Sequence, residues 1–95
     1  MEYQCPIDSI TYFNADTRKV VLGFPDGRHP PFKAGQYLEV VLPDNGKKCP
    51  FSIASAPGFG PGIELHVRPT PDSDDSAVIE RLLDERATLT VRIPK

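Results

Sequence analysis

The sequence predicts an all-β domain: a six-stranded antiparallel Greek-key barrel with one short capping α-helix at about residues 75–85. Eleven of the 95 residues are proline, about twice the usual share, and prolines between apolar segments end strands and stiffen turns. The apolar segments alternate with period two, as half-buried strands do. Short strands with one apolar face favour a closed or nearly closed barrel, because closure removes exposed edges.

Six segments carry the strand pattern. They are expected at residues 4–12, 18–24, 37–42, 49–55, 62–68 and 89–93. The alternation is clearest in GIELHVR, where Ile63, Leu65 and Val67 share one face and charged or polar residues take the other. The segments RKVVLGF and LTVRI follow the same rule, and their expected inward residues are Val20, Leu22, Phe24, Leu89, Val91 and Ile93.

The segment SDDSAVIERLLDERA departs from period two. Its apolar residues recur at helical spacing, with charged residues on the opposite side, which predicts a short amphipathic helix at one end of the barrel. Asp74, Asp75 or Ser76 is expected to cap its N-terminus, and the acidic first turn suits the positive end of the helix dipole. The composition does not shift along the chain, so residues 1–95 are expected to form one domain.

Charge and cysteine content exclude several classes of function. A formal charge of −2 and an isoelectric point near 5.6 give no basic field, so binding to nucleic acid is not expected. No apolar run approaches the roughly 20 residues of a membrane span, and MEYQCPIDSI lacks the layout of a signal peptide, so we expect a cytoplasmic chain without membrane contact. Cys5 and Cys49 are expected to be free thiols, and neither a metal motif nor a catalytic arrangement of side chains is present.

The run FKAGQYLEVVLPDNGKKCPFSIASAPGFGPGIELHVR, residues 32–68, resembles the flavin-binding barrel of the ferredoxin-reductase superfamily, above all its NAD(P)H–flavin reductase branch. In that family F-x-A-G-Q-Y, a strand, R-P-F/Y-S-x-A-S, a loop and I-E-L-H-V/I follow in this order. The helix and the last strand also come in the family's order, so the resemblance spans nearly the whole chain. It implies a flavin-binding domain of an NAD(P)H-dependent oxidoreductase that positions the isoalloxazine for hydride or electron transfer.

The resemblance also implies which residues meet the flavin. Pro50 and the two residues after it would lie along the ring. Ser52 would form a hydrogen bond with the N5/O4 edge, and Phe51 would pack near the ring or the ribityl chain. His66 and Val67 would line the neighbouring edge. An isoalloxazine needs a flat apolar wall and a few placed donors, and such a set supplies both.

The sequence departs from the family pattern at both positions where the family binds phosphate or ribityl groups. Cys49 occupies the position where the family has arginine, so a small thiol replaces a positively charged guanidinium group with several N–H donors. Lys47 is the better-oriented substitute cation, because it lies two residues away on the same strand face, although a solvated turn explains it equally well. At the helix start Ser76 alone matches the family's G-x-x-S/T, and the neighbouring aspartates would repel a phosphate. A tightly held FAD pyrophosphate at this helix is therefore disfavoured. The expected ligand is a flavin (FAD, FMN or riboflavin) that binds loosely, as a substrate, and is held mainly by its ring.

The chain ends at RIPK, where the family continues into a nucleotide-binding α/β domain. NAD(P)H is therefore expected to act only through a domain absent from this chain or through a separate redox partner, and the chain is not expected to be catalytically complete alone. The chain is expected to be either a domain of a longer reductase or a separate gene product with a partner protein, and Met1 does not favour a fragment from the middle of a protein. The alternative is a β-barrel interaction module that has lost flavin binding. An oligonucleotide-binding barrel is less favoured, because basic and aromatic residues do not interleave on one strand face.

Overall fold

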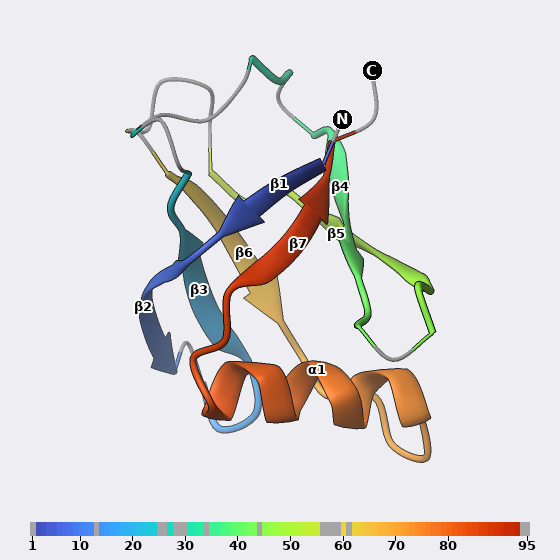
Figure 1. Cartoon of the computed structure of the whole chain (residues 1–95). Coiled ribbons are helices and arrows are strands. Elements are labelled where there is room, and N and C mark those ends of the chain that lie inside the picture. Colours follow the sequence, from blue (N-terminus) through green and yellow to red (C-terminus); the bar gives the residue numbers. More distant parts are fainter. Residues whose placement is uncertain are drawn as a thin grey trace.

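The computed structural model describes residues 2–12, 14–24, 27, 31–33, 35–43, 45–55, 60 and 62–93. This part of the chain forms seven strands in two sheets and one α-helix, which confirms the predicted all-β class with a single short helix (Figure 1). The elements in chain order are β1 (Glu2–Cys5), β2 (Ile7–Tyr12), β3 (Arg18–Leu22), β4 (Tyr37–Val41), β5 (Lys48–Ser52), β6 (Ile63–Val67), α1 (Asp74–Asp84) and β7 (Leu89–Arg92).

All strand pairs are antiparallel, in the orders β1-β7-β4-β5 and β2-β3-β6. The predicted first strand, residues 4–12, is divided at Pro6, with β1 in one sheet and β2 in the other. Proline cannot donate to a strand ladder, so the chain turns from one sheet to the other at this residue. This division raises the number of strands from the expected six to seven.

The two sheets do not close into a continuous barrel. Strand β5 is an edge of the first sheet and β6 an edge of the second. They meet at an isolated bridge between Ile53 and Leu65, where the N–H of Ala54 donates to the carbonyl oxygen of Glu64 at 2.8 Å. Within the described part of the chain, the two sheets are therefore joined only by this short seam and by the chain where it passes from β1 to β2 at Pro6, so the predicted barrel is only partly closed.

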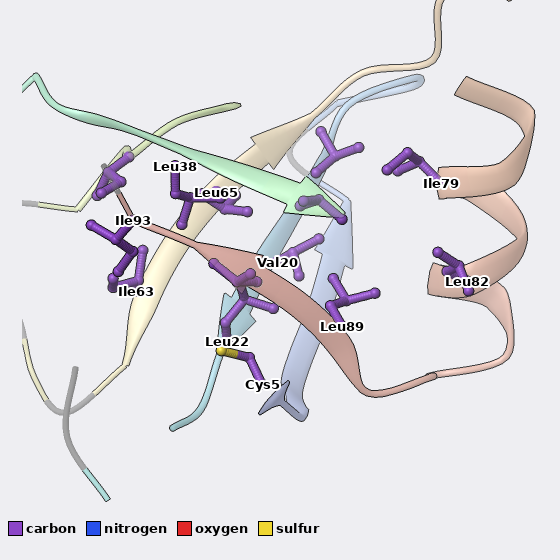
Figure 2. Packing of buried hydrophobic residues seen from close by; sticks show 14 of the residues in the cluster. Cys5, Val20, Leu22, Leu38, Ile63, Leu65, Ile79, Leu82, Leu89 and Ile93 are labelled. Atoms are coloured by element: carbon purple, nitrogen blue, oxygen red, sulfur yellow. The ribbon is translucent and has the colours of Figure 1, made fainter. Parts of the chain in front are cut away.

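The core lies between the two sheets and the inner face of α1. Figure 2 shows side chains from all three, including Val20 of β3, Leu89 of β7 and Ile79 of α1, pointing toward the same interior. The inward residues predicted from period two are all buried, at 9 % exposure or less. Alternation along these three segments thus identified the buried face correctly, because one side of each sheet packs against this core.

Helix α1 is capped by Ser73, so the expectation that Asp74, Asp75 or Ser76 would be the cap is wrong. Ser73 has extended backbone angles, φ −105° and ψ 120°, and its side-chain oxygen accepts the N–H of Ser76 at 3.2 Å. A cap must precede the first helical residue to bond the third, and Asp74 is already helical. The helix lies across one end of the two sheets and buries Ile79, Leu82 and Leu83, as predicted, while Val78 is only half-buried.

Arg18 fixes α1 to strand β3. Its guanidinium nitrogens lie 3.2 Å from Glu80 Oε1 and 2.8 Å from Asp84 Oδ1, and its side chain is 12 % exposed. A partly buried guanidinium that meets two carboxylates holds the helix in one orientation. This orientation sets where the first turn of α1 meets the sheets.

Close packing at Gly62 predicts a destabilising substitution. A Cβ at this residue would lie 2.6 Å from the backbone oxygen of Leu22, whereas a Cβ at Gly60 would meet nothing within 4 Å. Because strand backbone cannot move aside freely, Gly62→Ala is expected to lower the free energy of unfolding by about 1–3 kcal/mol. Urea denaturation measures the loss, with Gly60→Ala as the matched control. Equal stabilities of the two variants would contradict the prediction.

Candidate functional site

The seam between β5 and β6 is paired at one end and open at the other. At the paired end Ile53 bridges Leu65, and the N–H of Glu64 donates to the side-chain oxygen of Ser55 at 3.1 Å. Toward the start of β5 the two strands belong to different sheets, with no ladder between them in the described residues. The opening therefore lies beside the motif CPFS.

Pro50 removes one backbone donor from the edge of β5 that faces β6. The N–H of Ile53 donates to the carbonyl of Gln36 on the β4 side at 2.9 Å. Backbone groups alternate sides along an antiparallel strand, so the even-numbered residues of β5 turn theirs toward β6. The register of the bridge sets Pro50 opposite Arg68, and proline has no N–H to donate there. A proline at this position leaves the edge of β5 available to a ligand.

A cavity of about 180 Å³ lies at the open end of the seam. Strand β5, the end of β6 with the turn after it, and the first turns of α1 supply its walls. Its apolar lining consists of Pro50, Phe51, Val67 and Ile79. Phe51 and Ile79 also pack against the core, so this wall is held by the same contacts that stabilise the fold.

Five of the seven predicted site residues line this cavity, namely Cys49, Pro50, Phe51, Val67 and Ser76. The other two, Ser52 and His66, are exposed and outside its lining. The Nε2 of His66 lies 2.8 Å from Glu64 Oε2 on the outer side of β6. In the register of the bridge Ser52 and His66 face each other across the seam, between the cavity and the paired end.

The polar part of the cavity lies at the start of α1. Ser73 accepts the N–H of Ser76, and the Ser76 hydroxyl accepts the N–H of Thr70 at 2.8 Å. Lys47 Nζ lies 2.7 Å from Asp75 Oδ2, and this hydrogen bond raises the pKa of the lysine. The substitute cation considered for the family's arginine is thus paired with a carboxylate of the helix.

The two thiols differ in access. Cys5 is fully buried in the core, and burial raises its pKa to about 12. Cys49 is half-buried and lines the cavity, and its pKa is raised by burial and then by the nearby charge of Asp75. Neither cysteine is an activated nucleophile, since both are protonated at neutral pH.

Reasoning from the sequence predicted Val67 of β6 but missed most of the lining contributed by the segment between β6 and α1 and by α1 itself. Arg68, Thr70 and Ser73 carry no motif that marks them as cavity residues, and Ile79 was expected to pack in the core. Asp75 was expected to repel phosphate. Its pairing with Lys47 could not be predicted, because the two residues lie far apart in the sequence and no local pattern marks the pair. These residues become neighbours only because α1 packs across the end of the sheets.

The described residues contain no group of three or more His, Cys, Asp or Glu side chains placed to hold a metal ion. Their single helix also lacks the length and apolar character of a bilayer-crossing segment.

Comparison with known proteins connects this chain to a family. No family model matches the chain. The chain is 33 % identical over 93 residues to CDP-6-deoxy-L-threo-D-glycero-4-hexulose-3-dehydrase reductase from Yersinia pestis, covering 98 % of this chain and 28 % of the relative. It is 43 % identical over 72 residues to NAD(P)H-flavin reductase from Vibrio harveyi, covering 70 % and 27 %. The chain is homologous to the FAD-binding domain of ferredoxin-reductase-type flavin reductases.

Solved structures of such reductases share the fold. A cytochrome P450 reductase from Amycolatopsis matches the whole chain with a TM-score of 0.79 and 27 % identity, over 28 % of its own length. Phthalate dioxygenase reductase matches it with a TM-score of 0.77, over 29 % of its length, and at 22 % identity this likeness concerns the fold alone. The chain thus spans less than a third of the length of these reductases.

Proposed function

We propose that this chain is the flavin-binding domain of an NAD(P)H-dependent oxidoreductase and holds the isoalloxazine at the opening between β5 and β6. One observation carries the proposal: the cavity brings Cys49, Pro50 and Phe51 of the first family motif together with Val67 of the second. These segments lie far apart in the sequence. They meet at an unpaired strand edge around a cavity with an apolar wall and a polar end, which is the arrangement that a flat ring with a polar edge requires.

Some residues of the opening can make apolar contacts with a flavin, and others can form hydrogen bonds with it. Phe51, Val67 and Ile79 offer an apolar wall for the ring. Ser52 carries an exposed hydroxyl beside the open end of the seam, so this hydroxyl can meet the polar edge of the ring where the cavity ends. A bound flavin supplies the ability to accept a hydride and pass electrons onward.

The size of the cavity predicts weak binding. Its volume of about 180 Å³ is below the roughly 300–1,000 Å³ of pockets that enclose a whole ligand. Only part of a flavin can be buried there, and the rest remains in contact with solvent. We therefore propose a loosely bound flavin, used as a substrate or as an exchangeable cofactor.

This chain matches less than a third of the length of its relatives, so the rest of the electron-transfer system must lie outside it. Relatives named as reductase components transfer electrons together with other proteins, among them the terephthalate 1,2-dioxygenase reductase component from Comamonas. We propose that NAD(P)H reaches the flavin on a domain beyond this segment or on a separate protein, and that a further redox partner receives the electrons. The alternative of an interaction module without flavin is favoured by one observation, the pairing of Lys47 with Asp75 at the cavity.

Protection of the Cys49 thiol tests the flavin site. Iodoacetamide at mildly alkaline pH is expected to alkylate Cys49 slowly and Cys5 not at all, because burial raises both pKa values and encloses Cys5. Riboflavin at ten times its dissociation constant should slow the reaction about elevenfold, since about one site in eleven stays free. Mass spectrometry measures the rate, and adenosine at the same concentration is the control ligand. An unchanged rate with riboflavin would contradict the proposal.

A further inference from the structure

The polar end of the cavity contains a carboxylate and a cation that neutralise each other. The side chain of Asp75 lines the cavity, and Lys47 reaches it from the segment before β5, with 2.7 Å between Nζ and Oδ2. The Asp75 side chain is 29 % exposed, so its charge is less screened than one on an open surface. A phosphate entering this end would have to compete with Asp75 for the lysine.

The first turn of α1 has used several of its hydrogen-bonding groups internally. A helix N-terminus commonly binds anions through its free N–H groups. Here the N–H of Ser76 donates to the side chain of Ser73, the N–H of Ala77 donates to the carbonyl of Ser73, and the Ser76 hydroxyl accepts from Thr70. The N–H groups of Ser76 and Ala77 would have to break existing bonds before they could bind a phosphate.

The surface next to the cavity is acidic. An open hollow of about 500 Å³ shares Thr70, Ser73 and Ser76 with the cavity. Its lining adds the carboxylates of Asp72, Asp74 and Glu80 and no lysine or arginine. Glu80 is paired with Arg18, so a ligand chain that extends from the cavity over the helix start meets chiefly the carboxyl groups of Asp72 and Asp74.

Arg68 is the other cation at the cavity. It belongs to the lining, but its guanidinium nitrogen Nη2 lies 3.6 Å from Asp16 Oδ2, and its side chain is 73 % exposed. An exposed arginine with a carboxylate beside it contributes little net attraction for a second anion. The charges at the cavity thus cancel, and the surface that continues from it is negative.

We infer that the Lys47–Asp75 ion pair makes this site select flavins without a 5′-phosphate, so that riboflavin binds more tightly than FMN or FAD. The inference rests on the proposed function, because it concerns the same cavity. Riboflavin is uncharged, whereas a phosphate monoester carries about −1.5 to −2 charges near pH 7. Ring contacts are common to all three flavins. The difference between them therefore comes from Asp75 and the acidic residues around the helix start.

Two variants with opposite expected effects test this inference through the ratio of the dissociation constants for FMN and riboflavin. The ratio is expected to exceed one in the unaltered chain. Asp75→Asn removes the carboxylate and releases Lys47, so the ratio should fall roughly three- to tenfold at low salt. Lys47→Gln leaves Asp75 unpaired, so the ratio should rise. Glu85→Gln makes the same charge change at the far end of α1 and should leave the ratio unchanged.

Fluorescence titration with riboflavin and FMN, at low and high salt, measures the ratio, and high salt should bring it closer to one. Circular dichroism checks that each variant is folded. If riboflavin binds but the ratio is one or lower, or Asp75→Asn leaves the ratio unchanged, the selectivity inference is overturned and the flavin site stands. If neither flavin binds, the proposed function fails, and the selectivity fails with it.

Discussion

Replacing Leu65 by alanine is expected to lower the free energy of unfolding by about 2–5 kcal/mol. Leu65 is 1 % exposed, and its neighbours in the core come from both sheets. It also forms the bridge to Ile53 that joins β5 to β6. Removing its side chain leaves a cavity at the place where the two sheets meet, so neighbouring groups cannot relax fully into the space.

Urea denaturation followed by circular dichroism measures this loss of stability. A domain of this size has a total stability of about 5–15 kcal/mol, so the Leu65→Ala variant should unfold at a much lower urea concentration. Thr11→Ala, on an exposed position of β2, is the control and should change the free energy of unfolding by less than about 0.5 kcal/mol. Similar stabilities of the two variants would show that the seam is not part of the core.

Filling the cavity with Cys49→Trp is expected to weaken riboflavin binding at least about thirtyfold, equal to about 2 kcal/mol. Cys49 lines the cavity and is half-buried, and the indole ring is large compared with a space of about 180 Å³. The added ring would occupy the position proposed for the isoalloxazine. Fluorescence titration with riboflavin measures the change.

Cys49→Ser is the matched control for this substitution. It keeps the size of the side chain and therefore the cavity, so riboflavin affinity should stay within about threefold of the unaltered chain. Thr11→Trp adds the same indole on β2, outside the cavity lining, and should not affect binding. Riboflavin affinity that survives Cys49→Trp in a folded protein would place the flavin elsewhere.

The buried faces of the strands could be predicted from the sequence because they depend on local periodicity. Val20, Ile63 and Val91 are buried because every second residue of their strands faces the core, as the period-two pattern predicted. The division of the first strand at Pro6 was missed, although proline gave a local signal. The helix cap was placed one to three residues too late, because Ser73 and the acidic residues after it are all good capping types.

The candidate site could be predicted only in part, because its walls come from segments that lie far apart in the sequence. The motif CPFS marked one wall, and Val67 in the strand after it marked another. The contributions of Arg68 and Asp75 depend on how β6 ends and how α1 crosses the sheets. The ion pair between Lys47 and Asp75 is a consequence of that packing. Residue type alone therefore could not show that the expected substitute cation is already paired.

The most direct test of flavin binding at the β5–β6 opening is a titration of the chain with riboflavin followed by backbone amide shifts. The account predicts saturable shifts at the non-proline residues of 49–52, 67–70 and 73–76, with little change in β2 and on the far side of β7. The absence of any shift at millimolar riboflavin, or shifts confined to β2 and β7, would contradict it.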